Sequence, residues 1–463
     1  MPNKVELSRN QAREANEPIE HYDYVIIGTG LAETALSSIL ATNPNIKVLH
    51  IDTNSTYGNE FSTYNYTQLL NHFQCKTSKC TGSNEVIDIL ESDSIQVFDS
   101  KCTLDNRSFN IDLTPKLLLQ DSPMKDFLLN NKIHDIVLFT SIKGSYLYTD
   151  KLHSIPTNEM QSLRSSVVGF RQKCRVVKFF WNVRHYYESK AMDSKKTMLE
   201  EFQSFGLNED SIDFIGHAVA LNLDDKYLEE SPKKTYERIV RYVSSIVSYE
   251  DTESPYIYPL YGLSELCQAF ARKAALCGTT FMLNAQILEI EDKKLTILDP
   301  NGDRHVVKAD KIISDPKYWP GSIVQREIIR CIMVLRKGSL ESRNIIFLKR
   351  NLKRQNDIFC VVLGEQECAS PAEYEIGILS TVRESDRSPE EEIEPVLKKF
   401  NILRYFVEVR KLYSNVDQEN VYFTRNVDES ALLDNIYDDI VEICGKLKVA
   451  MPTGNAEIDI NKD

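Results

Sequence analysis

The stretch Tyr22-Asp-Tyr-Val-Ile-Ile-Gly-Thr-Gly-Leu-Ala-Glu33 decides the fold of this 463-residue chain. Its β-branched residues lead directly into Gly28 and Gly30, and a run of small residues follows. A second apolar run, Ile46-Lys-Val-Leu-His-Ile51, ends in Asp52. A strand, a glycine turn, a helix and a second strand with an acidic end are typical of a dinucleotide-binding βαβ unit. We therefore predict a Rossmann-type α/β fold.

The third glycine of the usual dinucleotide fingerprint is replaced by Glu33. This position lies in the first turn of the predicted helix, where backbone amides would attract a pyrophosphate. A carboxylate at the same place repels a phosphate. We interpret Gly28, Gly30, Glu33 and Asp52 as a vestigial nucleotide motif, and we expect no cofactor.

The composition is that of a globular protein with sizeable cores, because 42% of the residues are hydrophobic and 9% are aromatic. The chain carries 55 Lys and Arg against 68 Asp and Glu, which gives a net charge of −13. An acidic balance argues against general nucleic-acid binding and against electrostatic adsorption to anionic membranes. The length allows two or more domains of roughly 150 residues.

The targeting signals and cysteines favour a cytoplasmic protein. Residues 1–20 are polar and lack the apolar core of a signal peptide. We find no apolar run long enough to span a bilayer and no prenylation box. The ten cysteines are scattered, and the closest pair, Cys75 and Cys80, is not followed by a second pair at zinc-site spacing. His50 and His217 read as core histidines, and no catalytic arrangement is evident, so we expect no enzyme.

The stretch Ser254-Pro-Tyr-Ile-Tyr-Pro-Leu-Tyr-Gly-Leu-Ser-Glu-Leu-Cys-Gln-Ala-Phe-Ala-Arg272 predicts an extended segment followed by a helix. Glu265, Gln268 and Arg272 fall on one helix face, while Leu266 and its apolar neighbours fall on another. Such a helix can present a rigid polar surface to a partner. The plain alternative is an amphipathic helix with a solvated face.

These and other motifs resemble Rab GDP-dissociation inhibitors and the related Rab escort proteins. The resemblance runs from about residue 22 to about residue 447, and residues 258–272 carry its most specific part. A polar stretch at residues 75–107 looks longer than inhibitors usually have. The matching pieces are Val25-Ile-Ile-Gly-Thr-Gly-Leu-Ala-Glu33, Val48-Leu-His-Ile-Asp52, Tyr57-Gly58, Asn110-Ile-Asp-Leu-Thr-Pro-Lys116, Ile215-Gly-His-Ala218, residues 254–272 and Asp315-Pro316.

The resemblance implies a large domain I, similar to FAD-dependent monooxygenases, with a smaller all-helical domain II inserted into it. The sequence fits this outline, because helical patterns dominate residues 117–247, residues 117–119 included, and strand patterns resume at residue 280. The expected parts are a tail at 1–20, domain I at 21–115 and 248–447, domain II at 116–247 and a tail at 448–463, and residues 133–150 are candidates to join domain I.

The resemblance also implies the site residues. Phe281 stands where the family commonly has Tyr, and Asn59 stands where it has a second glycine. The platform that would grip the Rab protein is Tyr57, Glu265, Gln268, Arg272, Phe281 and Met282. The Rab tail would lie on Val137 and Phe139, expected to point outward from Ile136-Val-Leu-Phe139. The alternative is that these four residues are ordinary sheet core. Candidate prenyl-pocket residues are Leu118, Phe127, Leu128, Val167, Phe170 and Phe180, with Phe179, Ile212 and Ile215. Each of them, taken alone, is more often ordinary core.

The function that follows is binding without chemistry. A monomeric carrier would recognise a GDP-bound, prenylated Rab GTPase, slow its GDP release, shelter its geranylgeranyl lipid and touch the membrane only transiently. A Rab escort protein, which presents Rab to the geranylgeranyl transferase, is one alternative. A flavin-dependent oxidoreductase is the other.

Overall fold

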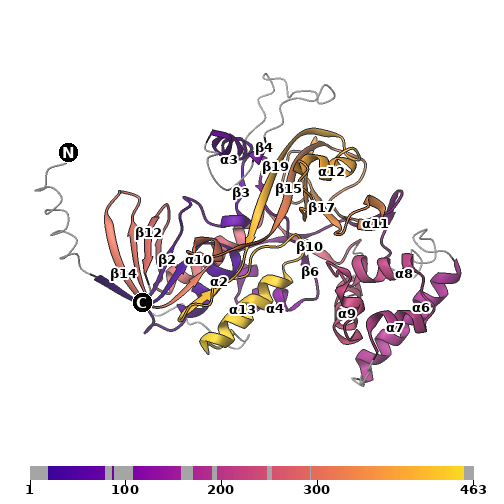
Figure 1. Cartoon of the computed structure of the whole chain (residues 1–463), viewed down its shortest axis with the longest axis horizontal. Coiled ribbons are helices and arrows are strands. Elements are labelled where there is room, and N and C mark those ends of the chain that lie inside the picture. Colours follow the sequence, from indigo (N-terminus) through magenta and orange to yellow (C-terminus); the bar gives the residue numbers. More distant parts are fainter. Residues whose placement is uncertain are drawn as a thin grey trace, which may run out of the picture.

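A computed structural model describes residues 19–78, 86–87, 108–157, 170–189, 196–247, 253–291 and 293–452. The molecule is elongated (Figure 1). One sheet occupies its left-hand end, a second sheet stands in the upper centre, and a group of helices forms the right-hand end.

The first sheet contains the predicted βαβ unit. Its parallel strands are β11 (Thr280–Met282), β2 (Val48–Ile51), β1 (Ile19–Ile27), β14 (Arg304–Ser314) and β20 (Val421–Phe423). The antiparallel strands β13 (Lys294–Leu298) and β12 (Gln286–Glu291) extend it past β14. Helix α2 (Leu31–Leu40) follows the glycine turn and packs against α10 (Ser264–Leu276) and α13 (Asp434–Leu447). The predicted α/β fold is therefore confirmed.

The second sheet has eight strands. Their order is β4 (Val86–Ile87), β19 (Ile402–Tyr413), β15 (Val324–Arg336), β18 (Tyr374–Val382), β17 (Ile358–Leu363), β16 (Arg343–Phe347), β8 (Gly144–Tyr148) and β9 (Leu152–Ser154). All neighbours are antiparallel except β8 and β16. Strands β8 and β9 come from the segment between helices in the sequence, while α12 (Pro389–Leu397) packs on β19.

The helical layer at the right-hand end of Figure 1 comprises α6 (Phe170–Ser189), α7 (Met198–Ser204), α8 (Glu209–Asp213), the π-helical segment η4 (Phe214–Val219), η5 (Asp225–Leu228) and α9 (Pro232–Val247). Phe179 is the centre of its core. The Phe179 ring lies 5.2 Å from that of Phe202, 5.5 Å from Phe205 and 5.7 Å from Tyr236. Aromatic edge contacts at these distances stabilise a close-packed interior.

Shorter elements connect these three parts. A small sheet joins β6 (Leu118–Leu119), β10 (Tyr256–Pro259) and β7 (Phe139–Ser141), while β3 (Thr63–Tyr64) pairs with β5 (Ile111–Asp112). The expected helical state of residues 117–119 is wrong, because Leu118 and Leu119 pair with β10. Helix α4 (Pro123–Asn130) packs on α13. The other short elements are η1 (Asn59–Phe61), α3 (Tyr66–Ser78), η3 (Ile133–Asp135), η6 (Pro316–Tyr318) and α11 (Lys349–Leu352).

The proposed division into two domains at residues 116 and 247 stays a prediction. Strand β8 lies within that interval and pairs with β16 in the eight-stranded sheet. Among the described residues, no helix is both long and apolar enough to cross a membrane.

Candidate binding surface

A buried carboxylate fixes the start of α10. Asp112 in β5 accepts hydrogen bonds from the Tyr258 hydroxyl, from Thr63 Oγ1 at 2.5 Å and from the Leu263 amide at 3.0 Å. Burial raises the pKa of Asp112 to about 6. The motifs around residues 110–116 and 258–272 therefore meet at one point, although more than a hundred residues separate them.

Gly262 makes this junction possible. Its φ of +103° lies in the left-handed region that glycine favours. A Cβ atom there would lie 2.5 Å from Thr63 Oγ1 and 2.7 Å from Asp112 Oδ1. A side chain at residue 262 would push apart the contacts that hold the helix start.

Helix α10 has the predicted two faces. Leu266 and Phe270 are buried, and the helix packs on α2 through this side. Gln268 and Arg272 are exposed and Glu265 is half-buried, so the predicted polar row faces outward. Burial raises the pKa of Glu265. Among the described residues, the Arg272 guanidinium has no hydrogen-bond or ion-pair partner, which leaves its five donors available.

Two further platform residues meet beside this helix. Phe281 in β11 stacks on His50 with ring centroids 4.8 Å apart, and the edge of Tyr57 approaches the same ring at 5.7 Å. Burial lowers the pKa of His50 to about 4, so the stacked ring is neutral. Met282 is partly buried against the core of the first sheet. A three-residue turn joins α10 to β11, so the six platform residues lie on consecutive elements and on the loop that carries Tyr57.

The glycine motif does not fit a dinucleotide. A Cβ at Gly30 would lie 2.5 Å from Glu33 Oε2, so the Glu33 carboxyl group folds back over the turn where a pyrophosphate would sit. Thr424 Oγ1 donates to this carboxyl group at 2.6 Å. Tyr318 and Asn59 lie over Gly28. Asp52 accepts from the Thr29 amide at 2.7 Å, which ties the acidic end of β2 to its own loop.

Glu33 gives a prediction about stability. Burial, with the Asp315 carboxylate as the next cause, raises the pKa of Glu33 from 4.5 to about 7. Ionisation of Glu33 therefore lowers the free energy of unfolding. The cost is absent below pH 4.5, grows as the pH rises and is complete above pH 7, where it reaches roughly 3 kcal/mol.

We expect Glu33→Gln to remove this cost while keeping an oxygen for Thr424. The variant should be more stable than wild type by about 3 kcal/mol at pH 8 and equal to it at pH 4. Chemical denaturation across this pH range measures the difference. A constant difference at all pH values would contradict a buried, titrating Glu33.

The apolar edge at residues 136–139 is turned the other way from the prediction. Val137 is only 3% exposed and packs in the main core, whereas Ile136 is 47% and Leu138 67% exposed. Phe139 is half-buried and begins β7. The predicted outward orientation of Val137 was wrong. After η3 ends at Asp135, inward and outward side chains alternate, and Val137 falls on the inward side.

The predicted prenyl-pocket residues lie on different elements of one large hydrophobic cluster. Its members include Leu118, Phe127, Leu128, Phe179 and Ile215, and Phe180 and Ile212 pack against it. The Phe127 ring stacks on Phe270 of α10 at 5.6 Å, and α4, which also carries Leu128, packs on α13. Leu118 lies in β6. Phe180 instead belongs to the helical layer, beside Phe179. Figure 1 shows α4 below the centre and α6 at the right-hand end. Phe170 begins α6, and Val167 lies outside the described residues.

The sequence did not indicate the ion pairs that join the helical layer to the second sheet. His217 is buried, as predicted, but its Nδ1 lies 2.8 Å from Asp357 Oδ2 and its Nε2 lies 3.1 Å from Asp225 Oδ1. Burial alone would lower the pKa of His217, but these carboxylates raise it to about 10. On α11, Lys349 pairs with Asp225, and Arg350 pairs with Asp210. No local sequence pattern indicates that His217 is charged, because Asp357, its nearest carboxylate, lies far away in the chain.

Gly216, next to His217, allows a second close contact. A Cβ at Gly216 would lie 1.8 Å from the Tyr227 hydroxyl oxygen. The π-helical segment thus brings η5 against η4, which positions Asp225 for its contact with His217. The motif Ile215-Gly-His-Ala218 therefore has a structural explanation.

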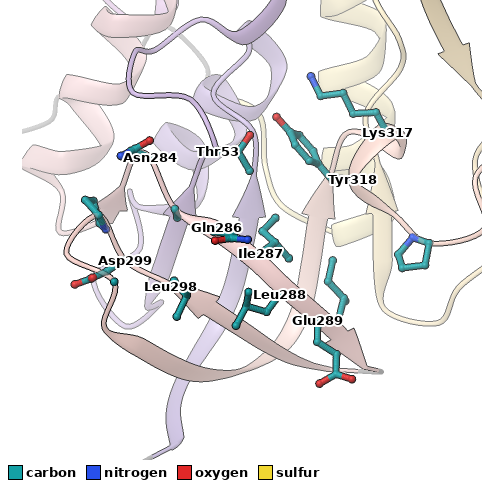
Figure 2. Close-up of a pocket in the computed structure, with 15 residues that line it drawn as sticks. Thr53, Asn284, Gln286, Ile287, Leu288, Glu289, Leu298, Asp299, Lys317 and Tyr318 are labelled. Atoms are coloured by element: carbon teal, nitrogen blue, oxygen red, sulfur yellow. The ribbon is translucent and has the colours of Figure 1, made fainter. Parts of the chain in front are cut away.

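A cavity of about 740 Å³ lies between the β12–β13 hairpin and η6. Figure 2 shows Thr53 and Tyr318 on one side and Gln286, Leu288 and Leu298 on the other. None of the predicted platform residues lines it. Among the residues that the structure describes, no group of three or more His, Cys, Asp or Glu side chains could hold a metal ion.

Comparison with known proteins gives one consistent result. The sequence model of the GDP dissociation inhibitor family matches residues 19–451. The probable secretory pathway GDP dissociation inhibitor 1 of Schizosaccharomyces pombe is 33% identical over 92% of this chain and 95% of its own length.

Solved structures agree with this result. A crystal structure of Rab GDI from Plasmodium falciparum superposes with a TM-score of 0.78 at 30% identity, covering 93% of this chain and 98% of that one. An oxidoreductase from Methanosarcina mazei has a TM-score of 0.54 at 12% identity over 91% of this chain and 99% of that one, which shows a shared fold alone.

Proposed function

This chain belongs to the GDP dissociation inhibitor family, and from that premise we propose that it is a Rab GDP-dissociation inhibitor. It binds GDP-bound, prenylated Rab GTPases, slows their GDP release, extracts them from membranes and carries them between membranes in vesicle transport. The observation that carries this proposal is the outward polar row of α10, a helix whose start is fixed by Asp112. The ring contact between Tyr57 and Phe281 adds to it.

The chemistry of the platform suits a protein partner. Arg272 offers a fork of donors, Glu265 and Gln268 accept hydrogen bonds, and Tyr57 combines apolar area with a polar tip. The rigid attachment of α10 lowers the entropy lost on binding. A surface complementary to the switch regions in their GDP arrangement would stabilise that arrangement, and GTP would reshape the partner.

The exposed Ile136 and Leu138 support a contact for the apolar residues of the Rab tail. They replace Val137 as the outward residues of this edge, with Phe139 beside them. The prenyl chain would enter the helical layer. Burying it is worth roughly 0.8 kcal/mol per methylene, so the carrier must offer an apolar volume comparable to the membrane. Since Phe179 is fully buried among aromatic rings, lipid entry beside it would require α6 to move away from its neighbours.

The proposal involves no catalysis by this chain. The Glu33 carboxyl group at the glycine turn disfavours the flavin oxidoreductase alternative. The family match favours an inhibitor over a Rab escort protein. Stable, prenyl-dependent binding of the geranylgeranyl transferase in a pull-down would instead favour the escort role.

The proposal predicts nucleotide-dependent extraction. Membranes bearing prenylated Rab are mixed with the purified protein and sedimented, and Rab is measured in the supernatant. We expect release when Rab holds GDP and retention when it holds a GTP analogue, because only the GDP state presents the surface that the platform fits. Equal release in both states, or none with GDP, would contradict the proposal.

A further inference from the structure

We infer that the outer face of α6 is a docking surface for membranes that carry anionic lipid headgroups. Its outward side chains include Arg171, Lys178 and Trp181. The inference deepens the proposed function, on which its biological role rests, because extraction brings the protein to a membrane.

The charge of α6 is opposite to that of the whole chain. Helix α6 contains five Lys or Arg and one acidic residue, Glu188 near its end, while the whole chain carries a net charge of −13. Positions 171, 174, 178, 181 and 185 are all exposed, and their helical spacing places them on one face. Figure 1 places α6 at the right-hand end of the molecule, opposite the end that carries β12 and β14.

Two large apolar side chains lie on this cationic face. Trp181 is 75% exposed and Val177, one turn earlier, is 50% exposed. The opposite face of the helix is buried and packs in the core through Val176, Phe179 and Val183. A helix whose outer face combines cations with an exposed tryptophan has the pattern of an interfacial helix. Indole rings favour the headgroup level, where one edge is apolar and the other is wet.

The neighbouring carboxylate does not neutralise the face. Glu201 on α7 accepts a hydrogen bond from Tyr236 at 2.9 Å and is only 12% exposed, so it is directed inward. Arg175 is held by the Gly206 carbonyl oxygen at 2.6 Å and links α6 to the end of α7. Arg171 and Lys178 are exposed on the outer face.

Charge complementarity selects an anionic membrane. Electrostatic fields decay over about 8–10 Å at physiological ionic strength. A local cationic face can therefore attract an anionic membrane even when the protein as a whole is acidic. The net negative charge disfavours adsorption to anionic membranes for the surfaces away from α6. It does not apply to the cationic face of α6. Each cation near an anionic leaflet strengthens adsorption about fivefold, and the exposed Trp181 adds apolar burial.

Tryptophan fluorescence gives a direct test, since the chain has only two tryptophans. Trp319 is 8% exposed in the core of the first sheet, so any response to vesicles reports Trp181. The full-length protein, without Rab, is titrated with phosphatidylcholine vesicles that contain or lack phosphatidylserine. We expect a blue shift and co-sedimentation only with phosphatidylserine, both weakened by added salt.

Matched variants test the location. Arg171→Gln with Lys178→Gln should weaken vesicle binding roughly 30-fold, from about fivefold per cation. Lys294→Gln with Lys308→Gln makes the same charge change at exposed positions on the β13–β14 hairpin and should have little effect. Trp181→Phe should abolish the fluorescence shift.

The inference would be overturned by an absence of binding to phosphatidylserine vesicles at low salt, by equal binding to neutral vesicles, or by equal losses in the two double variants. If vesicles do not bind but an acidic protein does, the face serves a protein and not a membrane. Inhibition of GDP release from prenylated Rab in solution is measured in parallel. Normal inhibition with failed vesicle binding would reject only the membrane inference.

Discussion

We expect His217→Ala to destabilise the protein by about 3–5 kcal/mol, because it would leave the fully buried Asp357 carboxylate without its cation. His217 lies in the helical layer, and Asp357 directly precedes β17 of the second sheet. The variant should therefore loosen the joint between these two parts. Chemical denaturation measures the loss, and hydrogen exchange should locate it in η4 and α8 first.

His305→Ala is the matched control. His305 also lies near carboxylates, at 3.6 Å from Asp299 and 4.0 Å from Glu20, but it is 31% exposed. Exposed pairs contribute about 0–1 kcal/mol, so this change should be mild. A double-mutant cycle with Asp357→Asn isolates the pair. Equal effects of the two histidine changes would show that the buried pair does not stabilise the joint.

The same pair predicts a pH dependence. The pKa of His217 is raised from 6.5 to about 10, so its stabilising contribution is complete below pH 6.5 and is lost as the pH rises towards 10. Wild-type stability should fall by about 1.4 kcal/mol per pH unit from this source over that interval. The slope should be shallower in the alanine variant.

The second large effect concerns the platform. We expect Arg272→Ala to weaken binding to GDP-bound, prenylated Rab by roughly 30-fold or more, as truncation of a central interface arginine commonly costs about 2–4 kcal/mol. The free protein should keep its stability, because Arg272 is exposed and its guanidinium has no partner among the described residues. Binding is measured by titration, and the thermal midpoint is recorded for each variant.

Arg336→Ala provides the control, since Arg336 is an exposed arginine at the end of β15 in the other sheet. It should leave Rab affinity unchanged. Unchanged affinity of Arg272→Ala together with a normal melting curve would remove α10 from the interface. A melting curve that falls together with affinity would instead indicate a structural role.

The sequence by itself determined the scaffold. The run into Gly28 and Gly30 specified strand, turn and helix through local preferences, and β1, α2 and β2 form as predicted. The spacing of Leu266 and Phe270 against Gln268 and Arg272 determined both faces of α10, because helical periodicity is a local property. Glu33 was identified as incompatible with a phosphate from its place in the first turn alone.

Only the tertiary structure decided which distant residues meet. Asp112 reaches the start of α10, and Asp357 reaches His217, across separations that no local pattern records. Whether Val137 points inward or outward depended on where η3 ends. Phe127 faces α10 because α4 packs on α13. The outward direction of Trp181 likewise followed from which side of α6 packs on α9. Periodicity defines faces, whereas packing between elements decides which face is covered.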